Sequence, residues 1–364
     1  MSKQTGEGKV VWSCNEWDPL EEVIVGIADH ATVPVWSKWL GSSTPNHAKW
    51  FFEKYGGKPF PEEMIEKANI ELDGLVKVFE QHGVKVRRPD VIDYTKSNKT
   101  PWWESTGLYS AMPRDILMVV GDTIIEAPMT WRERYFEIYA YREMITDYFR
   151  QGARWLPAPK GSMKDDFYNA DYNHQDAAAG GIRTYVVGES EVAFDAADFF
   201  RCGKDIFVQK SNVTNSLGIE WVRRQLDDNF TVHEVSLGDD YPMHIDTSLV
   251  PLSPGKLLIN PKWVKREHIP KQFDSWEIID APEPVKPYDS GLYFSSDWLT
   301  MNIMTIDEKH IIVEENELPL IALLEKHGFT PVPIPFRNFY PFGGSVHCAT
   351  TDVRRRGSLE SYFD

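Results

Sequence analysis

The chain has 364 residues, of which 42% are apolar and 13% aromatic, and its formal net charge is −16. This composition excludes a disordered chain, and the length allows one large domain or two to three small ones. The negative charge argues against nucleic acid or an anionic membrane as the main partner, whereas it would attract a small cationic substrate.

The chain begins with a polar segment, and no stretch approaches the roughly 18 uninterrupted apolar residues of a membrane span. Three widely spaced cysteines, Cys14, Cys202 and Cys348, indicate neither a disulfide framework nor a paired zinc-ribbon pattern. We therefore expect a cytoplasmic protein in a reducing compartment.

The first predicted element is a strand at residues 22–27, whose β-branched residues suit a half-buried sheet. A loop rich in proline, tryptophan, lysine and glycine follows. A helix is then predicted from Pro61, with apolar positions that recur at three- and four-residue steps, and Gly83 ends it. Residues 84–86 resume as a strand.

This order of helix, glycine or asparagine, and strand returns later in the chain. The later copies have helices at residues 135–149, 217–226, near Phe273 and 318–326. Five such units favour a repeat architecture over an ordinary α+β protein, in which helices and strands also alternate. Because no linker marks a boundary, we expect residues 1–364 to form a single domain, with residues 1–14 flexible.

Hairpins are predicted between these units, with turns at Gly121-Asp122, Gly203-Lys204, Ser253-Pro254-Gly255 and Asp307-Glu308-Lys309. Polar residues stand just upstream of the hairpins: Asp115, Asp195 with Asp198, His244 with Asp246, and Ser295-Ser296. If the units pack around a common axis, these equivalent positions converge on one pocket. Cys348 belongs to the last of them.

Cys348 follows Gly343-Gly344-Ser345-Val346-His347 and precedes the basic run Arg354-Arg355-Arg356. A thiol in a flexible, positively charged loop is typical of a nucleophile, because nearby cations lower the cysteine pKa from about 8.5. The alternative is that Cys348 is a small buried hydrophobe and the arginines a solvated strand or tail.

The acidic positions suit a cationic substrate. Carboxylates at Asp115, Asp195 and Asp246 can hold a planar guanidinium with bidentate hydrogen bonds, and a thiolate can attack its central carbon. His244 can then protonate the departing amine and later take a proton from the incoming one. Asp195 and Asp198 could instead be turn or cap residues, and Asp115 could be a strand-entry residue. A single histidine such as His244 is more often structural than catalytic.

A metal site is a second alternative for these side chains. His244 and Asp246 with His347 and Cys348 could form a mixed site, but their spacing fits no compact zinc pattern.

At these positions the sequence resembles the amidinotransferases, in particular the glycine amidinotransferases, and it is also similar to those of antibiotic and toxin pathways. The resemblance covers nearly the whole chain. It is carried by Asn15-Glu16-Trp17-Asp18-Pro19-Leu20-Glu21-Glu22-Val23-Ile24-Val25-Gly26, Ser105-Thr106-Gly107-Leu108-Tyr109-Ser110-Ala111-Met112-Pro113-Arg114-Asp115, Phe194-Asp195-Ala196-Ala197-Asp198-Phe199, Met243-His244-Ile245-Asp246, His347-Cys348 and Asp352-Val353-Arg354-Arg355-Arg356-Gly357.

The resemblance implies a five-bladed α/β propeller, or pentein, built from ββαβ modules with pseudo-fivefold symmetry. It implies that Cys348 is the nucleophile, His244 the general acid/base and Asp195 its carboxylate partner. Asp115 and Asp246 would bind the guanidinium, and Met243 and Ser296 would line the pocket. Arginine would give its amidino group to Cys348, ornithine would leave, and an amine would collect the group. No cofactor or metal is implied, and a homodimer is expected by analogy.

Two departures from the glycine amidinotransferases bear on the acceptor. Tyr241 replaces an asparagine three positions before the motif histidine, and Trp263 in Asn260-Pro261-Lys262-Trp263 replaces an arginine that would grip the substrate carboxylate. Lys262 or Lys265 could substitute for that arginine, or the register could shift there without functional change. The acceptors considered are lysine, giving homoarginine, glycine, giving guanidinoacetate, and an amine of a specialised pathway.

Two other functions compete with amidino transfer. An arginine deiminase-like hydrolase would use the same cysteine, histidine and aspartates with water as the second nucleophile, giving citrulline and ammonia. A non-enzymatic arginine-binding or interaction protein could also retain the propeller.

Overall fold

A computed structural model of the chain describes residues 4–173, 183–239, 241–286 and 297–363. Their main feature is a set of five three-stranded sheets with the same internal pattern: two antiparallel strands, then a third strand parallel to the middle one. The chain is therefore of mixed α/β class.

Four of these sheets are continuous in sequence. They are β5 (Leu117–Val120), β6 (Thr123–Glu126) and β7 (Arg154–Pro157); β8 (Phe199–Cys202), β9 (Asp205–Gln209) and β10 (Thr231–Val235); β11 (Leu249–Ser253), β12 (Lys256–Ile259) and β13 (Glu277–Asp280); and β14 (Met304–Thr305), β15 (His310–Glu314) and β16 (Thr330–Ile334).

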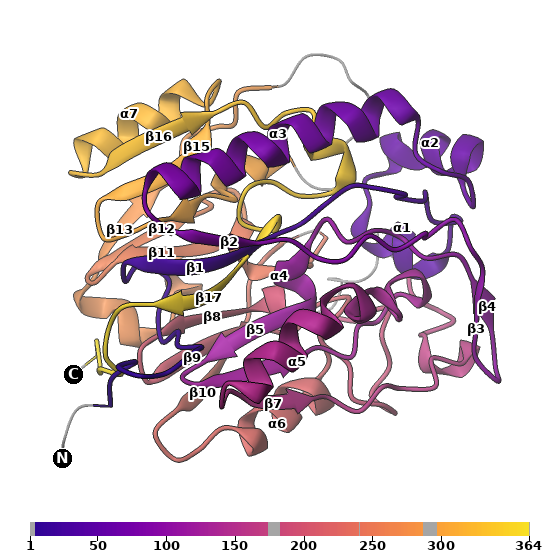
Figure 1. Cartoon of the computed structure of the whole chain (residues 1–364), viewed down its shortest axis with the longest axis horizontal. Coiled ribbons are helices and arrows are strands. Elements are labelled where there is room, and N and C mark those ends of the chain that lie inside the picture. Colours follow the sequence, from indigo (N-terminus) through magenta and orange to yellow (C-terminus); the bar gives the residue numbers. More distant parts are fainter. Residues whose placement is uncertain (1–3, 174–182, 240, 287–296, 364) are drawn as a thin grey trace.

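The fifth sheet joins the two ends of the chain. Its strands are β17 (Thr350–Arg355), β1 (Leu20–Val25) and β2 (Lys85–Arg87). β17 pairs antiparallel with β1, and Figure 1 shows the yellow C-terminal strand beside the indigo N-terminal one. A separate small pair is formed by β3 (Asn98–Lys99) and β4 (Glu104–Ser105).

A helix links the second and third strands in each sheet. These helices are α3 (Glu62–Gln81), α5 (Arg142–Arg150), α6 (Ser216–Gln225), the 3₁₀ helix η9 (Lys271–Ser275) and α7 (Leu318–Lys326). The four α-helices each pack against the third strand of their own sheet. The predicted order of helix and strand is thus confirmed for all five units, with a 3₁₀ helix near Phe273.

The remaining helices are short. They are α1 (Lys38–Ser43), α2 (Lys49–Tyr55), α4 (Pro113–Ile116), η1 (Asn46–Ala48), η2 (Arg132–Arg134), η3 (Glu137–Tyr141), η4 (Asp165–Phe167), η6 (Ala196–Asp198), η7 (Ile245–Thr247), η8 (Arg266–His268), η10 (Asp297–Met301) and η11 (Tyr340–Phe342). No helix among the described residues is long and apolar enough to cross a membrane.

Local sequence explains the repeated shape. α3 buries Leu72, Leu75 and Phe79, which recur at the helical period, and Gly83 follows it with a φ of +75°. In three of the hairpins a glycine occupies the turn with positive φ, the conformation that lacks a steric cost only for glycine. These glycines are Gly121, Gly203 and Gly255.

A buried ionic cluster ties distant segments of the chain together, and we call Glu16, Arg114, Arg201, Asp352 and Arg355 the arginine cluster. Asp352 accepts hydrogen bonds from all three arginines, at distances from 2.7 to 3.2 Å. Glu16 accepts from Nε and Nη2 of Arg201, each at 2.8 Å. Burial alone would raise the pKa of Asp352, but the guanidinium groups hold it well below its usual range.

The N-terminal segment differs from the expectation of a flexible stretch at residues 1–14. Val11, Trp12 and Cys14 are buried, and Trp12 donates a backbone hydrogen bond to Val353 of β17. Because apolar side chains anchor it against the C-terminal strand, the expectation is wrong for residues 11–14.

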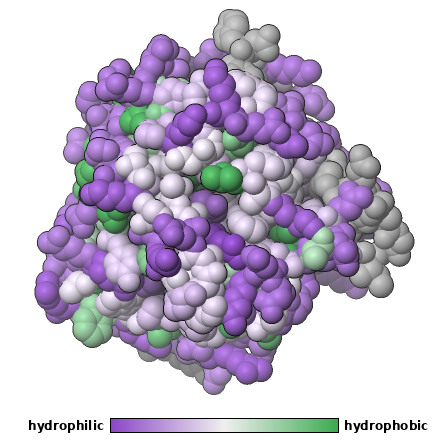
Figure 2. Space-filling view, turned by 90° about the vertical axis from the view of Figure 1, so that its right-hand side faces the viewer, coloured by the Kyte–Doolittle hydropathy of each residue, from purple (hydrophilic) through white to green (hydrophobic). Residues whose placement is uncertain are grey.

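Hydrophilic residues dominate the face in Figure 2, where hydrophobic side chains stand singly. This pattern is normal for a protein surface.

Candidate active site

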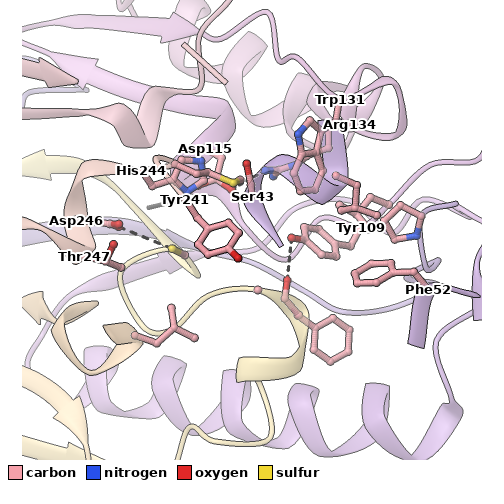
Figure 3. A pocket seen from close by; sticks show the side chains of 18 of the residues that line it. Ser43, Phe52, Tyr109, Asp115, Trp131, Arg134, Tyr241, His244, Asp246 and Thr247 are labelled. Carbon is pink, nitrogen blue, oxygen red and sulfur yellow. Dashed lines mark hydrogen bonds and ion pairs between the residues drawn. The ribbon is translucent and has the colours of Figure 1, made fainter. Parts of the chain in front are cut away.

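One cavity gathers most of the predicted site residues. Including the space at its open mouth it measures about 810 Å³. It is lined by Pro34, Leu40, Ser43, Phe52, Leu108, Tyr109, Asp115, Trp131, Arg134, Asp239, Tyr241, Met243, His244, Asp246, Thr247, Leu299, Phe342, Gly343 and Cys348. Figure 3 shows Asp115, His244 and Asp246 toward one end and the rings of Phe52, Tyr109 and Trp131 toward the other. The carboxylates and the imidazole therefore stand apart from the three rings, and the cation Arg134 is labelled beside Trp131.

The polar side chains of the site come from equivalent places in the fold. Asp115 lies in α4 directly before β5. Asp195, which contacts His244 but is not among the residues that line the cavity, stands at the N-terminal end of η6 before β8. Asp246 lies in η7 before β11, and Cys348 stands two residues before β17. The segment ahead of the first strand of a sheet thus supplies a site residue in four of the five sheets, as the sequence predicted.

His244 connects two of the aspartates to the thiol. Its Nε2 lies 3.2 Å from Oδ2 of Asp195, and its Nδ1 lies 3.5 Å from Oδ1 of Asp115. The side chains of Asp115, His244 and Cys348 offer polar atoms that all lie within 4.8 Å of one another. His244 has a φ of +61°, a sparsely populated conformation for a residue with a side chain that is often found at functional sites.

Asp246 also contacts the thiol. Its Oδ2 lies 3.8 Å from Cys348 Sγ, the contact drawn in Figure 3, and 2.6 Å from Nδ1 of His347. The same oxygen accepts a 2.7 Å hydrogen bond from Nδ2 of Asn302. Asn302 has no role predicted from the sequence, and His347 was considered there only as a possible metal ligand.

The three aspartates share an unusual feature. Oδ1 of Asp115, Oδ1 of Asp195 and Oδ1 of Asp246 are buried and have no hydrogen-bond partner among the described residues. Leaving a buried carboxylate oxygen without a donor costs free energy. A ligand with several N–H groups, such as a guanidinium, would remove that cost.

Charge and burial set the protonation states. Burial, then the Asp246 carboxylate, raises the pKa of Cys348 to about 12, although a hydrogen bond from His244 opposes the shift. Burial alone would lower the pKa of His244, but Asp115, Asp195 and the Cys348 thiol raise it well above 6.5. These shifts favour a neutral thiol and a protonated imidazole in the site.

The carboxylates differ from one another. Burial raises the pKa of Asp195, with the hydrogen bond from His244 opposing it. Burial would also raise the pKa of Asp246, but the hydrogen bond and charge of His347 outweigh it and lower that pKa. Asp246 is thus the more firmly ionised of these two at neutral pH.

The prediction that the basic run lowers the pKa of Cys348 is wrong. Arg355 points into the arginine cluster, where it donates to Asp352, and Arg354 donates to Glu21 at 2.6 Å. In a strand, successive side chains face opposite sides of the sheet, so neighbours in sequence diverge in space. The charges that contact the thiol are instead those of His244 and Asp246.

The residues expected to line the pocket or to bear on the acceptor fall in different places. Tyr241 and Met243 line the cavity. Ser296 lies outside the described residues. Trp263 is buried and donates a 2.7 Å hydrogen bond from Nε1 to Ser248 Oγ. It is not among the residues that line the cavity. Lys262 and Lys265 are exposed and are likewise not part of the lining, which leaves the proposal that either replaces a carboxylate-binding arginine without support.

Asp115, His244 and Cys348 also have the spacing of a metal-binding group. A histidine must be neutral to bind a metal, yet both ring nitrogens of His244 face carboxylates and its pKa is raised. This arrangement favours proton transfer over metal coordination.

Comparisons with known proteins identify the family of this chain. No family model matches the sequence. The sequence is 47% identical over 353 residues to the L-arginine:L-lysine amidinotransferase of Pseudomonas savastanoi pv. phaseolicola, covering 97% of this chain and 96% of that protein. It is 46% identical over 361 residues to the mitochondrial glycine amidinotransferase of Gallus gallus, covering 97% of this chain and 85% of that protein.

A solved structure is similar over the same length. SxtG, an amidinotransferase of the saxitoxin biosynthetic pathway from Microseira wollei, superposes with a TM-score of 0.90 at 45% sequence identity, covering 97% of this chain and 99% of that one. With relatives of this identity over nearly its whole length, the chain belongs to the amidinotransferase family and is a transferase.

Proposed function

We propose that this protein transfers the amidino group of L-arginine to a primary amine through a covalent intermediate on Cys348. The observation that carries the proposal is one thiol and one imidazole in contact with buried carboxylates, of which Asp115 and Asp246 line the cavity and keep Oδ1 without a hydrogen-bond donor. A guanidinium supplies the missing N–H groups and places its central carbon beside the sulfur.

In the first half of the reaction, Sγ of Cys348 forms a bond to the guanidinium carbon. The bond from that carbon to the δ-nitrogen of arginine breaks, and ornithine leaves. The thiol proton reaches the departing amine by way of His244, and the amidino group remains on sulfur as a cation. Asp195 orients the imidazole through its 3.2 Å contact with Nε2.

In the second half, a neutral amine attacks the amidino carbon. The carbon–sulfur bond breaks, and the proton lost by the amine returns to sulfur through His244. The product is a new guanidinium, and the thiol is regenerated. The cation of arginine also explains how a thiol with a raised pKa becomes reactive, since a positive charge beside sulfur stabilises the thiolate.

We infer that the acceptor is lysine, giving homoarginine. The end of the cavity away from the thiol is lined by Phe52, Tyr109 and Trp131. This apolar wall suits a long methylene chain better than glycine. A relative at 47% identity is named an L-arginine:L-lysine amidinotransferase.

An acceptor screen tests both parts of this proposal. The protein is incubated with arginine alone and with arginine plus lysine, glycine or other amines. We expect ornithine only when an amine is present, and homoarginine as the fastest product. Citrulline and ammonia from arginine alone would indicate a hydrolase and contradict the proposal, and guanidinoacetate as the fastest product would contradict the choice of lysine.

The finer features of the assembly are proposals as well. We propose that the five equivalent sheets are the blades of a propeller in a single domain, which is supported by their shared strand pattern and by the convergence of their leading segments on one cavity. The homodimer and the cytoplasmic location remain predictions.

A further inference from the structure

Asn302 occupies the position in the remaining sheet that corresponds to the site residues of the other four. It follows η10 and stands two residues before β14, as Cys348 stands two residues before β17. Asn302 is 1% exposed. The five sheets thus each direct a polar residue from the same place toward one centre.

The side-chain amide of Asn302 makes four contacts within this centre. Its Oδ1 accepts hydrogen bonds from the backbone N–H groups of Ser345, at 3.1 Å, and Cys348, at 3.0 Å. Its Nδ2 donates to Oδ2 of Asp246 at 2.7 Å and to Sγ of Cys348 at 3.2 Å. Only an oxygen can accept from two backbone donors, so the orientation of the amide is fixed by its surroundings.

The two contacts of Asn302 Nδ2 affect both Sγ of Cys348 and the carboxylate of Asp246. A donor directed at Sγ stabilises the thiolate more than the thiol, and it offsets the Asp246 charge 3.8 Å from the sulfur. A donor directed at Oδ2 of Asp246 leaves Oδ1 of that carboxylate for a ligand.

We propose that Asn302 is a catalytic residue that stabilises the Cys348 thiolate and presents Asp246 to the guanidinium. This proposal rests on the covalent function proposed above. It differs from a purely structural role, in which Asn302 would only hold the backbone of the loop at residues 343–348.

Two substitutions separate these roles. Asn302→Ala removes every side-chain contact. Asn302→Asp keeps an oxygen for the two backbone N–H groups of the loop but replaces the donor with a negative charge beside Sγ. The aspartate variant therefore tests the donor even if the alanine variant does not fold.

Asn15 offers a matched control. It is equally buried, its Oδ1 also accepts from two backbone N–H groups, those of Trp17 and Asp18, and its Nδ2 also donates to a side chain, Tyr362. Asn15→Ala therefore removes the same number and kind of loop contacts without touching the thiol.

The first measurement is the rate at which iodoacetamide alkylates Cys348 at pH 8 without substrate, followed by mass spectrometry of the peptide. This rate reports the thiolate fraction and requires no turnover. We expect it to fall about 10-fold or more in both Asn302 variants, because a hydrogen bond to a charged group is lost, and to stay unchanged in Asn15→Ala. The second measurement is steady-state kinetics, in which we expect kcat to fall and KM for arginine to rise in the Asn302 variants.

Alkylation and kinetics in both Asn302 variants that match those of Asn15→Ala would overturn the role of Asn302. Failure of the covalent function would look different, since Cys348→Ala would then retain turnover or arginine would leave no adduct on Cys348. The alkylation rates would still show whether Asn302 stabilises the thiolate.

Discussion

Two buried ionic groups in this protein differ in how completely their carboxylate oxygens are hydrogen-bonded. In the arginine cluster, every carboxylate oxygen of Glu16 and Asp352 accepts a hydrogen bond from a described residue. In the candidate active site, Asp115, Asp195 and Asp246 each keep one buried oxygen without such a partner. The first group is complete within the chain, whereas the second has the unpaired acceptors that we propose a cationic substrate fills.

The difference shows in the protonation equilibria. The guanidinium groups keep the pKa of Asp352 well below its usual range. The ionised carboxylate therefore stabilises the folded chain through these arginines and needs no ligand to do so. Burial raises the pKa of Asp195 and Cys348 in the site, because fewer charges compensate for desolvation. Burial also raises the pKa of Cys202 outside the cavity, so the candidate site is marked by raised pKa values together with a cavity and not by the shift alone.

The largest effect is expected from the thiol. Cys348→Ala removes the atom that forms the covalent bond, and we expect turnover with arginine and lysine to fall about 10⁴-fold or more. Cys202→Ala is the matched control, because Cys202 is also a buried thiol but lies in β8 away from the cavity lining. Equal turnover in the two variants would mean that Cys348 contributes no more to the reaction than a buried thiol outside the site.

An isosteric substitution in each group tests the comparison directly. Asp352→Asn leaves three buried arginines without their shared anion, and we expect the free energy of unfolding to fall by about 3–5 kcal/mol. Asp246→Asn removes a charge that faces the cavity, and we expect KM for arginine to rise about 10- to 100-fold, with little loss of stability.

Urea unfolding and steady-state kinetics of both aspartate variants provide the measurement. A loss of stability in Asp246→Asn as large as in Asp352→Asn would mean that the site carboxylate is also a structural one. The comparison would then fail.

A smaller effect is expected from the loop that carries the nucleophile. A Cβ at Gly344 would lie 2.6 Å from Cβ of Cys348 and 2.8 Å from Sδ of Met112, so Gly344→Ala must displace the thiol. We expect kcat to fall about 10- to 100-fold. In the control Gly74→Ala, the new Cβ meets nothing within 4 Å on helix α3, and we expect full activity with stability raised by about 0.5–1 kcal/mol. Normal kcat in Gly344→Ala would show that the sulfur position is not critical.

The smallest effect concerns the pH dependence of stability. The pKa of His244 is raised in the folded chain, so its pairing with Asp115 and Asp195 stabilises the fold fully below about pH 6.5 and is lost as the pH rises through the folded-state pKa, which lies well above 6.5. The arginine cluster should contribute constantly over this range, because arginine stays charged.

The corresponding measurement is the difference in free energy of unfolding between the wild type and His244→Gln from pH 6 to 9. We expect this difference to become smaller as the pH rises. A difference that is constant, or that grows with pH, would contradict the assignment of an imidazolium.

The sequence predicted the repeated units and the main members of the site for one physical reason. A hairpin preceded by a polar residue is a local pattern, and repetition of that pattern implies that equivalent positions meet. Asp115, Asp195 and His244 were placed together in this way, with the contacts found in the structure.

The errors arose where the outcome depends on spatial neighbours. Arg354 and Arg355 lie close to Cys348 in sequence, but β17 directs them to Glu21 and the arginine cluster, respectively. The pairing of Glu16 with Arg201 spans 185 positions and leaves no local trace.

Asn302 was missed because an uncharged amide after Leu299-Thr300-Met301 carries no chemical signal, and Ser295-Ser296 appeared to fill its place. Its spacing before the strand, equal to that of Cys348, was the available signal.

The most direct test of covalent amidino transfer through Cys348 is the mass of this residue after incubation of the protein with arginine and no acceptor. We expect the peptide containing Cys348 to gain the mass of one amidino group and one equivalent of ornithine to be released. Added lysine should then remove the label as homoarginine. An unmodified Cys348 in a preparation that still transfers the amidino group from arginine to lysine would contradict covalent transfer through this residue.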